Sequence, residues 1–135
     1  MPLSPLPGAP DSARQRTHVA FAQTGSTDVD DAYERELQQA DQALRQEDFE
    51  TAFRHLERAH VLAQRMTGRH TFVHWRMLVA GLNRGDLREV IGQLPRIVAS
   101  VLFSRLWVPR GNSGRARVSA FAPMPVPDDL RHLVP

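Results

Sequence analysis

The sequence predicts an all-α fold: a small antiparallel helical bundle of four to five helices with an extended Pro-rich C-terminal strap. Between residues 28 and 107, apolar side chains recur at steps of three and four, which is the period of amphipathic helices. The breaks between these stretches are short, and short connections make consecutive helices antiparallel neighbours. All but one of the ten prolines lie outside this region.

Composition sets the outer limits. A chain of 135 residues with 41% hydrophobic positions forms one domain with a single core. There are no cysteines, so disulfides and thiolate metal ligands are excluded. No apolar run approaches the length of a membrane span, and the start lacks the pattern of a signal peptide. We therefore expect a cytoplasmic protein with no membrane segment.

The helical domain is expected over residues 28–107, after a disordered Pro-rich arm at residues 1–27 that holds four prolines and has no regular apolar period. Thr27 and Asp28 can cap the first helix. In the second helix, apolar residues from Phe49 to Ala63 form one stripe that resembles the second helix of a tetratricopeptide unit. This similarity gives the first hairpin a tetratricopeptide-like shape.

The third helix is expected from Arg69 to Arg84 after a break at Thr67-Gly68, and it is apolar nearly all round. Gly85 ends it, and Asp86 with Glu89 forms the start signal of a fourth helix. Pro95 should kink that helix or divide it in two. Its apolar residues are expected to face inward: Leu87, Ile91, Leu94, Val98, Val101 and Leu102.

The second and third helices carry the residues of a candidate metal site. Glu57 and His60 have the i, i+3 spacing by which bundle helices place a carboxylate and an imidazole beside one metal. His70 and His74 have the i, i+4 spacing of zinc-binding helices. Folding the two helices together brings these four side chains within reach of one another. Three imidazoles and a carboxylate suit a divalent transition metal such as Zn, Fe, Ni or Cu.

Two interpretations of this cluster remain open. In the first, the chain is a metal-binding protein, and an enzyme, a carrier and a sensor are all compatible with the sequence, which indicates no catalytic residue. In the second, the histidines form a structural polar seam, because buried histidines are often only hydrogen-bonded. The protein would then be an interaction adaptor of tetratricopeptide-like shape with an unknown protein partner. The sequence indicates no oligomeric state.

Residues 108–135 predict the extended strap, packed on the bundle. Its glycine-rich loop offers a weak candidate for anion binding, in which backbone N–H groups and arginines converge; the residues are Arg110, Gly111, Asn112, Gly114 and Arg115. We favour the alternative that the arginines of this loop meet the acidic helices. Residues 28–60 are acidic and residues 61–135 are basic, which supports that alternative. Nucleic-acid binding is not favoured because no aromatic residues are interleaved with the basic ones.

Three motifs occur together: His-Leu-Glu-Arg-Ala-His from His55, His-x3-His-Trp-x-Met-Leu from His70, and Pro-x-Gly-Asn-Ser-Gly-x3-Val-Ser-x-Phe-x-Pro-Met-Pro from Pro109. In this combination the chain resembles a family of small uncharacterised bacterial proteins known only as a domain of unknown function. The similarity covers roughly residues 30–130. It implies no activity, but it suggests that the histidine hairpin and the Gly-Asn-Ser-Gly segment act together.

Overall fold

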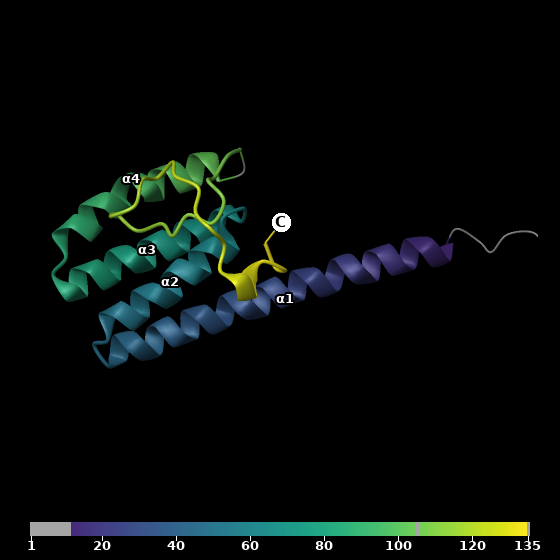
Figure 1. Cartoon of the computed structure of the whole chain (residues 1–135), viewed down its shortest axis with the longest axis horizontal. Helices are drawn as coiled ribbons and strands as arrows, with labels where there is room; N and C mark the ends of the chain where they lie inside the picture. The colour runs from purple at the N-terminus through teal and green to yellow at the C-terminus, as the bar shows by residue number, and fades with distance from the viewer. Residues whose placement is uncertain (1–11, 105, 135) are drawn as a thin grey trace, which may run out of the picture.

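The computed structural model describes residues 12–104 and 106–134, and this part of the chain is all-α, as predicted. Four α-helices are followed by one short 3-10 helix: α1 Ser12–Arg45, α2 Phe49–Ala63, α3 Thr67–Arg84, α4 Leu87–Phe103 and η1 Asp128–Leu130. Each helix packs against the next one along the chain (Figure 1). None of the described helices has both the length and the apolar character needed to cross a membrane.

The helix boundaries follow local capping. The side chain of Asp48 accepts a hydrogen bond from the N–H of Thr51 at the start of α2, and Asp86 accepts one from Glu89 at the start of α4. Gly85 ends α3 with a φ of 73°, a left-handed conformation that favours glycine. The turn between α2 and α3 falls at residues 64–66, so the break expected at Thr67-Gly68 is wrong and Gly68 lies inside α3.

α1 begins earlier than its apolar period indicated. Residues 12–27, which were expected to be irregular, belong to the helix that starts at Ser12. The four prolines of the expected arm all lie at or before Pro10, so the residues that follow contain no helix breaker of this kind. The rest of that prediction concerns residues 1–11, which lie outside the described residues.

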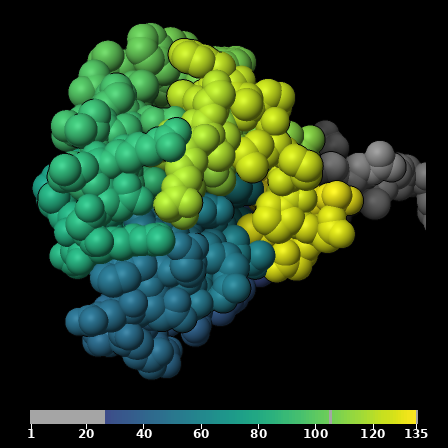
Figure 2. Space-filling model, turned by 60° about the vertical axis from the view of Figure 1, so that its left-hand side comes forward, coloured from purple at the N-terminus to yellow at the C-terminus, as the bar shows by residue number. Residues whose placement is uncertain are grey.

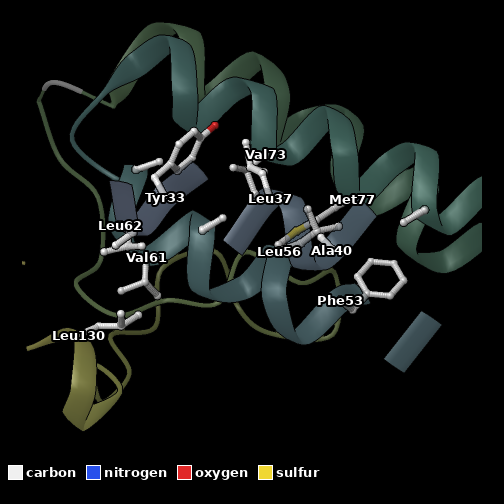
Figure 3. Packing of buried hydrophobic residues seen from close by; sticks show 14 of the residues in the cluster. Tyr33, Leu37, Ala40, Phe53, Leu56, Val61, Leu62, Val73, Met77 and Leu130 are labelled. Atoms are coloured by element: carbon white, nitrogen blue, oxygen red, sulfur yellow. The ribbon is translucent and has the colours of Figure 1, made fainter. Parts of the chain in front are cut away.

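The hydrophobic core lies between α1, α2 and α3 (Figure 3). Tyr33 and Leu37 of α1 meet Phe53 and Leu56 of α2, and Met77 contributes from α3. Leu130 of η1 closes one end of this cluster. Burial of these stripes is the main favourable term that holds the first three helices together.

The C-terminal segment, residues 106–134, is a series of turns with η1 near its end. It lies across the bundle and covers one side of it (Figure 2). The carbonyl of its Asn112 accepts from the amide of Gln64, which follows the last residue of α2, and its Arg115 pairs with Glu89 of α4. These contacts fix the segment relative to the histidines.

α4 has the opposite orientation to the one expected. It is one continuous helix through Pro95, so the two-helix alternative is wrong, and its inward side chains are the polar Glu89, Gln93 and Ser100. The six apolar residues predicted to face inward are instead between 54% and 68% exposed: Leu87, Ile91, Leu94, Val98, Val101 and Leu102. The reason is that buried polar groups need polar partners, and α4 supplies them.

Candidate metal centre

Three histidines converge between α2 and α3. The Nε2 atom of His60 lies 2.8 Å from that of His70 and 3.2 Å from that of His74, and the last two are 3.2 Å apart. All three side chains are buried, with exposed fractions between 2% and 5%. Among the described residues, these are the ones whose ligand atoms gather closely enough to hold a metal ion.

The helical hairpin explains this convergence. His70 and His74 are one turn apart on α3, so they lie on the same face of that helix. His60 lies in the last turn of α2, on the stripe that also buries Leu56 and Ala63. The tight turn at residues 64–66 then places the last turn of α2 beside the first turns of α3.

The other ring nitrogen of each histidine has its own partner. The Nδ1 atom of His60 lies 2.8 Å from the carbonyl oxygen of Asn112. A carbonyl oxygen only accepts hydrogen bonds, so this Nδ1 carries the proton. The neutral ring then has a bare lone pair on Nε2.

The same holds for His74, whose Nδ1 lies 2.7 Å from Oε1 of Gln93. The amide nitrogen of Gln93 donates to Glu89 Oε1 at 2.6 Å and to the Gly114 carbonyl at 2.9 Å. These two bonds fix the orientation of the amide, so its oxygen faces His74 and accepts. His74 therefore also presents an unprotonated Nε2.

His70 completes the set. Its Nδ1 lies 2.7 Å from the hydroxyl oxygen of Ser104. The hydroxyl proton of Ser104 is used in a hydrogen bond to the carbonyl of Ser100, so the oxygen accepts from the His70 ring. The Nε2 of His70 is therefore also unprotonated and has a free lone pair.

Three lone pairs thus point at one another, and no proton lies between them in the neutral state. This arrangement is repulsive unless a cation lies at its centre. Zinc binds imidazole nitrogen at about 2.0–2.1 Å, so the nitrogens around a regular tetrahedral ion are roughly 3.3 Å apart. The observed separations of 2.8 to 3.2 Å are close to that spacing.

Burial keeps the rings neutral. Loss of hydration, together with the influence of neighbouring histidines, lowers the pKa of His70 to about 3 and that of His60 well below 6.5. Burial also lowers the pKa of His74 to about 4, although the hydrogen bond that the ring donates to Gln93 opposes this change. At neutral pH a metal ion would therefore displace no protons from these nitrogens.

Glu57, the fourth residue of the expected site, lies outside the cluster. Its carboxylate accepts a hydrogen bond from Arg115 at 3.0 Å. Burial raises the pKa of Glu57, and the pairing with Arg115 opposes that rise. The i, i+3 spacing with His60 was correct for a shared helix face, but Arg115 takes the carboxylate.

In the glycine-rich loop, the backbone N–H groups of the two glycines expected to bind an anion have partners within the protein. Gly111 and Gly114 have positive φ angles of 72° and 78°, as a nest requires. Their N–H groups, however, donate to side chains of the protein itself: Gly111 to Gln64 and Gly114 to Asn112. The carbonyl of Arg110 accepts from Met124.

The side chain of Arg115, the second arginine of that site, is engaged within the protein. It pairs with both Glu57 and Glu89, and it stacks on the ring of Phe53 at 3.8 Å. The arginine thus meets the acidic helices, as the favoured alternative predicted. The loop instead supports the histidine cluster, because the backbone carbonyls of Asn112 and Gly114 accept hydrogen bonds from His60 and Gln93.

Sequence reasoning missed Gln93 and Ser104, the side chains that orient His74 and His70. Gln93 lies on the polar side of α4 and Ser104 is the residue that caps its C-terminal end, whereas the sequence analysis expected the apolar side of this helix to face inward. A signal was present: Glu89, Gln93, Ser100 and Ser104 share one face of the helix at steps of four, seven and four. A polar stripe aligned with buried histidines indicates hydrogen-bond partners.

A cavity of about 360 Å³ opens beside the histidines. All three rings line it, and so do Phe103, Trp107 and Phe121. The rings of Trp107 and Phe121 are stacked, with 6.1 Å between centroids. The converging nitrogens are therefore accessible from a pocket with largely apolar walls, a setting typical of small-molecule sites.

Comparison with known proteins places the chain in a family without assigning it an activity. The model of a family described as "Protein of unknown function (DUF3703)" matches residues 27–134. The predicted similarity to a domain of unknown function is thereby confirmed. No curated protein and no solved structure matches the chain.

Proposed function

This chain belongs to the DUF3703 family, whose function is unknown, so we propose a function from the site itself: the protein binds one divalent transition metal ion through Nε2 of His60, His70 and His74. The observation that carries the proposal is the set of three lone pairs directed at one point. Each is fixed by a hydrogen bond on the opposite ring nitrogen.

The structural-seam alternative explains these contacts poorly. In a polar seam, each histidine would donate to its neighbour or accept from it. Here all three ring protons are on Nδ1, so none is left for a hydrogen bond between the rings. A histidine that binds a metal through one ring nitrogen usually donates a hydrogen bond from the other ring nitrogen, as all three do here.

Three neutral imidazoles favour Zn, Fe, Ni or Cu over the harder magnesium and calcium ions. Three protein ligands also leave a tetrahedral ion with one open position. The adjoining cavity gives that position access to a small molecule. An enzyme with the metal as Lewis acid or redox centre fits this arrangement better than a purely structural site, which is usually closed by four protein ligands.

The test is the metal content of protein purified without a histidine tag. We expect about one equivalent of metal per chain, measured by plasma mass spectrometry after incubation with Zn, Fe, Ni or Cu salts and desalting. At a free-metal concentration 1,000 times Kd, binding should stabilise the fold by about 4 kcal/mol. A calorimetric scan should therefore show a higher melting temperature for loaded protein.

The matched variants are His60→Ala and His74→Ala, which should lose the bound metal and the thermal shift. His132→Ala removes an exposed histidine of the C-terminal segment and should keep both. Unchanged metal content in both cluster variants, or no binding by the wild type with any of the four metals, would contradict the proposal.

A further inference from the structure

The cavity beside the histidines is lined by a positively charged side chain, Arg96, that forms no ion pair with a carboxylate of the described residues. Building on the proposed metal centre, we propose that the cavity binds a small monocarboxylic acid, with its carboxylate between the metal and Arg96 and its hydrocarbon part against the aromatic wall. The class of ligand follows from the charge of the cavity and from the character of its walls.

Arg96 lies on α4 and lines the same cavity as the three histidines. Its guanidinium donates to the carbonyl oxygens of Gly92 at 2.8 Å and Val118 at 2.6 Å. Both acceptors are neutral, and no carboxylate of the described residues forms an ion pair with this arginine. Burial lowers the pKa of Arg96, as expected for a cation without a paired anion.

The nearby carboxylate is already committed elsewhere. Glu89 accepts from Arg115 on Oε2 at 3.1 Å, and from Gln93 and the N–H of Ala116 on Oε1. It therefore pairs with Arg115 and not with Arg96. A divalent ion on three neutral histidines, beside Arg96, would give the cavity a net charge of about +3, which favours an anionic ligand.

The walls select among anions. Phe103, Trp107 and Phe121 offer apolar surface to the ligand, which an inorganic anion such as phosphate would leave uncovered. A carboxylate with a hydrocarbon chain would use both the charge and the rings. Each buried methylene contributes about 0.8 kcal/mol, or roughly a fourfold gain in affinity. Arginine also matches the planar geometry of a carboxylate.

The experiment uses cobalt(II)-loaded full-length protein, whose visible absorption spectrum reports a new ligand on the ion. Acetate, butyrate and hexanoate are titrated in turn, with hexanamide as the uncharged control and phosphate as the inorganic anion. We expect spectral changes with all three carboxylates, and affinity that rises roughly fourfold per methylene. Hexanamide and phosphate should bind at least tenfold more weakly than hexanoate.

Arg96→Gln should lower hexanoate affinity at least tenfold while one cobalt ion per chain is retained. Arg131→Gln removes an exposed arginine paired with Asp128 and should change neither value. If the protein binds neither cobalt nor any of Zn, Fe, Ni and Cu, the proposed function fails. If cobalt binds but no carboxylate changes the spectrum, or phosphate binds as well as hexanoate, this inference is overturned and the metal centre stands.

A separate observation concerns the outer face of α4. We define its apolar seam as Leu87, Ile91, Leu94, Val98 and Val101, which are spaced by four, three, four and three residues. This is the heptad spacing of a coiled coil, whose apolar stripe packs against a second helix. All five side chains are more than half exposed. We infer that a second copy of this chain covers the seam.

The dimensions fit that occupant. α4 has 17 residues and is about 25 Å long at 1.5 Å per residue. With the exposed Phe72, Trp75 and Leu82 of neighbouring α3, the apolar face is about two helices wide. Such a face buries on the order of 500–800 Å² per partner, which approaches the size of a standard stable interface.

Charge does not oppose self-association. α4 carries three charged residues, of which Glu89 is buried and Arg96 lines the cavity. Only Arg88 remains near the seam, so two copies meet with little repulsion. By helical phase the seam also lies on the side of α4 away from Arg96 and Phe103, which leaves the cavity open.

Analytical ultracentrifugation between 1 and 100 µM should show a dimer. Leu94→Glu with Val98→Glu changes two exposed positions and should shift the Kd at least a hundredfold toward monomer, with unchanged helical circular dichroism. Gln38→Glu with Gln39→Glu adds the same charge to exposed positions of α1 and should leave the dimer intact. A monomeric wild type overturns the inference. Flotation of that monomer with phosphatidylglycerol vesicles would show that the seam binds a membrane surface and not a second copy.

Discussion

Acidification of the metal-free protein should remove most of its stability between pH 6.5 and about 4. In the unfolded chain the three histidines take up protons near pH 6.5, whereas burial holds the pKa of His70 at about 3 and that of His74 at about 4. The unfolded state therefore binds more protons in this window, so the free energy of unfolding falls as the pH falls. Each histidine lowers the free energy of unfolding by about 1.4 kcal/mol per pH unit, and the three together lower it by roughly 4 kcal/mol per pH unit.

Urea denaturation at half-unit steps of pH measures this slope. His70→Gln should reduce it by about a third, because one titrating group is removed. His132→Gln, in the exposed part of the C-terminal segment, should leave the slope unchanged. A slope about two-thirds as steep would show that the folded cluster holds one shared proton, and a free energy of unfolding that stays constant from pH 6.5 to 5 would show that all three rings take up protons in the folded state. Either result contradicts the assignment of three converging lone pairs.

Gly114→Ala is expected to impair both the fold and the metal centre. Gly114 has a φ of 78°, which costs other residues about 1–2 kcal/mol, and an added Cβ would lie 2.7 Å from Cδ2 of the His60 ring. The ring must move away, so its Nε2 loses alignment with the other two. We expect a loss of about 2–4 kcal/mol in unfolding free energy, and a 10- to 100-fold loss of metal affinity, as for other changes that displace a ligand.

Gly85→Ala separates the two effects. Gly85 has a nearly identical φ of 73°, but a Cβ there would meet nothing within 4 Å. This variant should lose about 1 kcal/mol of stability and keep its metal affinity. Denaturation and competition with a chromogenic chelator measure the two quantities. Equal metal affinities in Gly114→Ala and Gly85→Ala would show that the position of the His60 ring does not control metal binding.

Most of the bundle was predictable because its signals are local. Apolar period identified the helices, and side chains such as Asp86 and Gly85 marked their ends. Residues 12–27 were expected to be irregular because residues 1–27 were judged together by their proline content, although all four prolines lie at or before Pro10. The histidine triad was predictable for the same reason as the helices, since spacing on a helix determines which side chains share a face.

The orientation of α4 was not predictable from its own residues. An amphipathic period shows that Leu94 and Gln93 lie on different faces, but it does not show which face is buried. The usual rule selects the apolar face. Here the Nδ1–H groups of two buried histidines require acceptors, and Gln93 and Ser104 supply them. The cost of leaving such groups unpaired decides in favour of the polar face.

The sequence by itself determined that the bundle has four amphipathic helices and which three histidines are candidate ligands. Only the tertiary structure decided that Glu57 pairs with Arg115, that α4 turns its polar side inward, and that residues up to 52 positions away fix the ring protons. The physical reason is the distance along the sequence over which each interaction acts. Helix period and capping act within a few residues, whereas the partner of a buried polar group can come from any part of the chain that packs beside it.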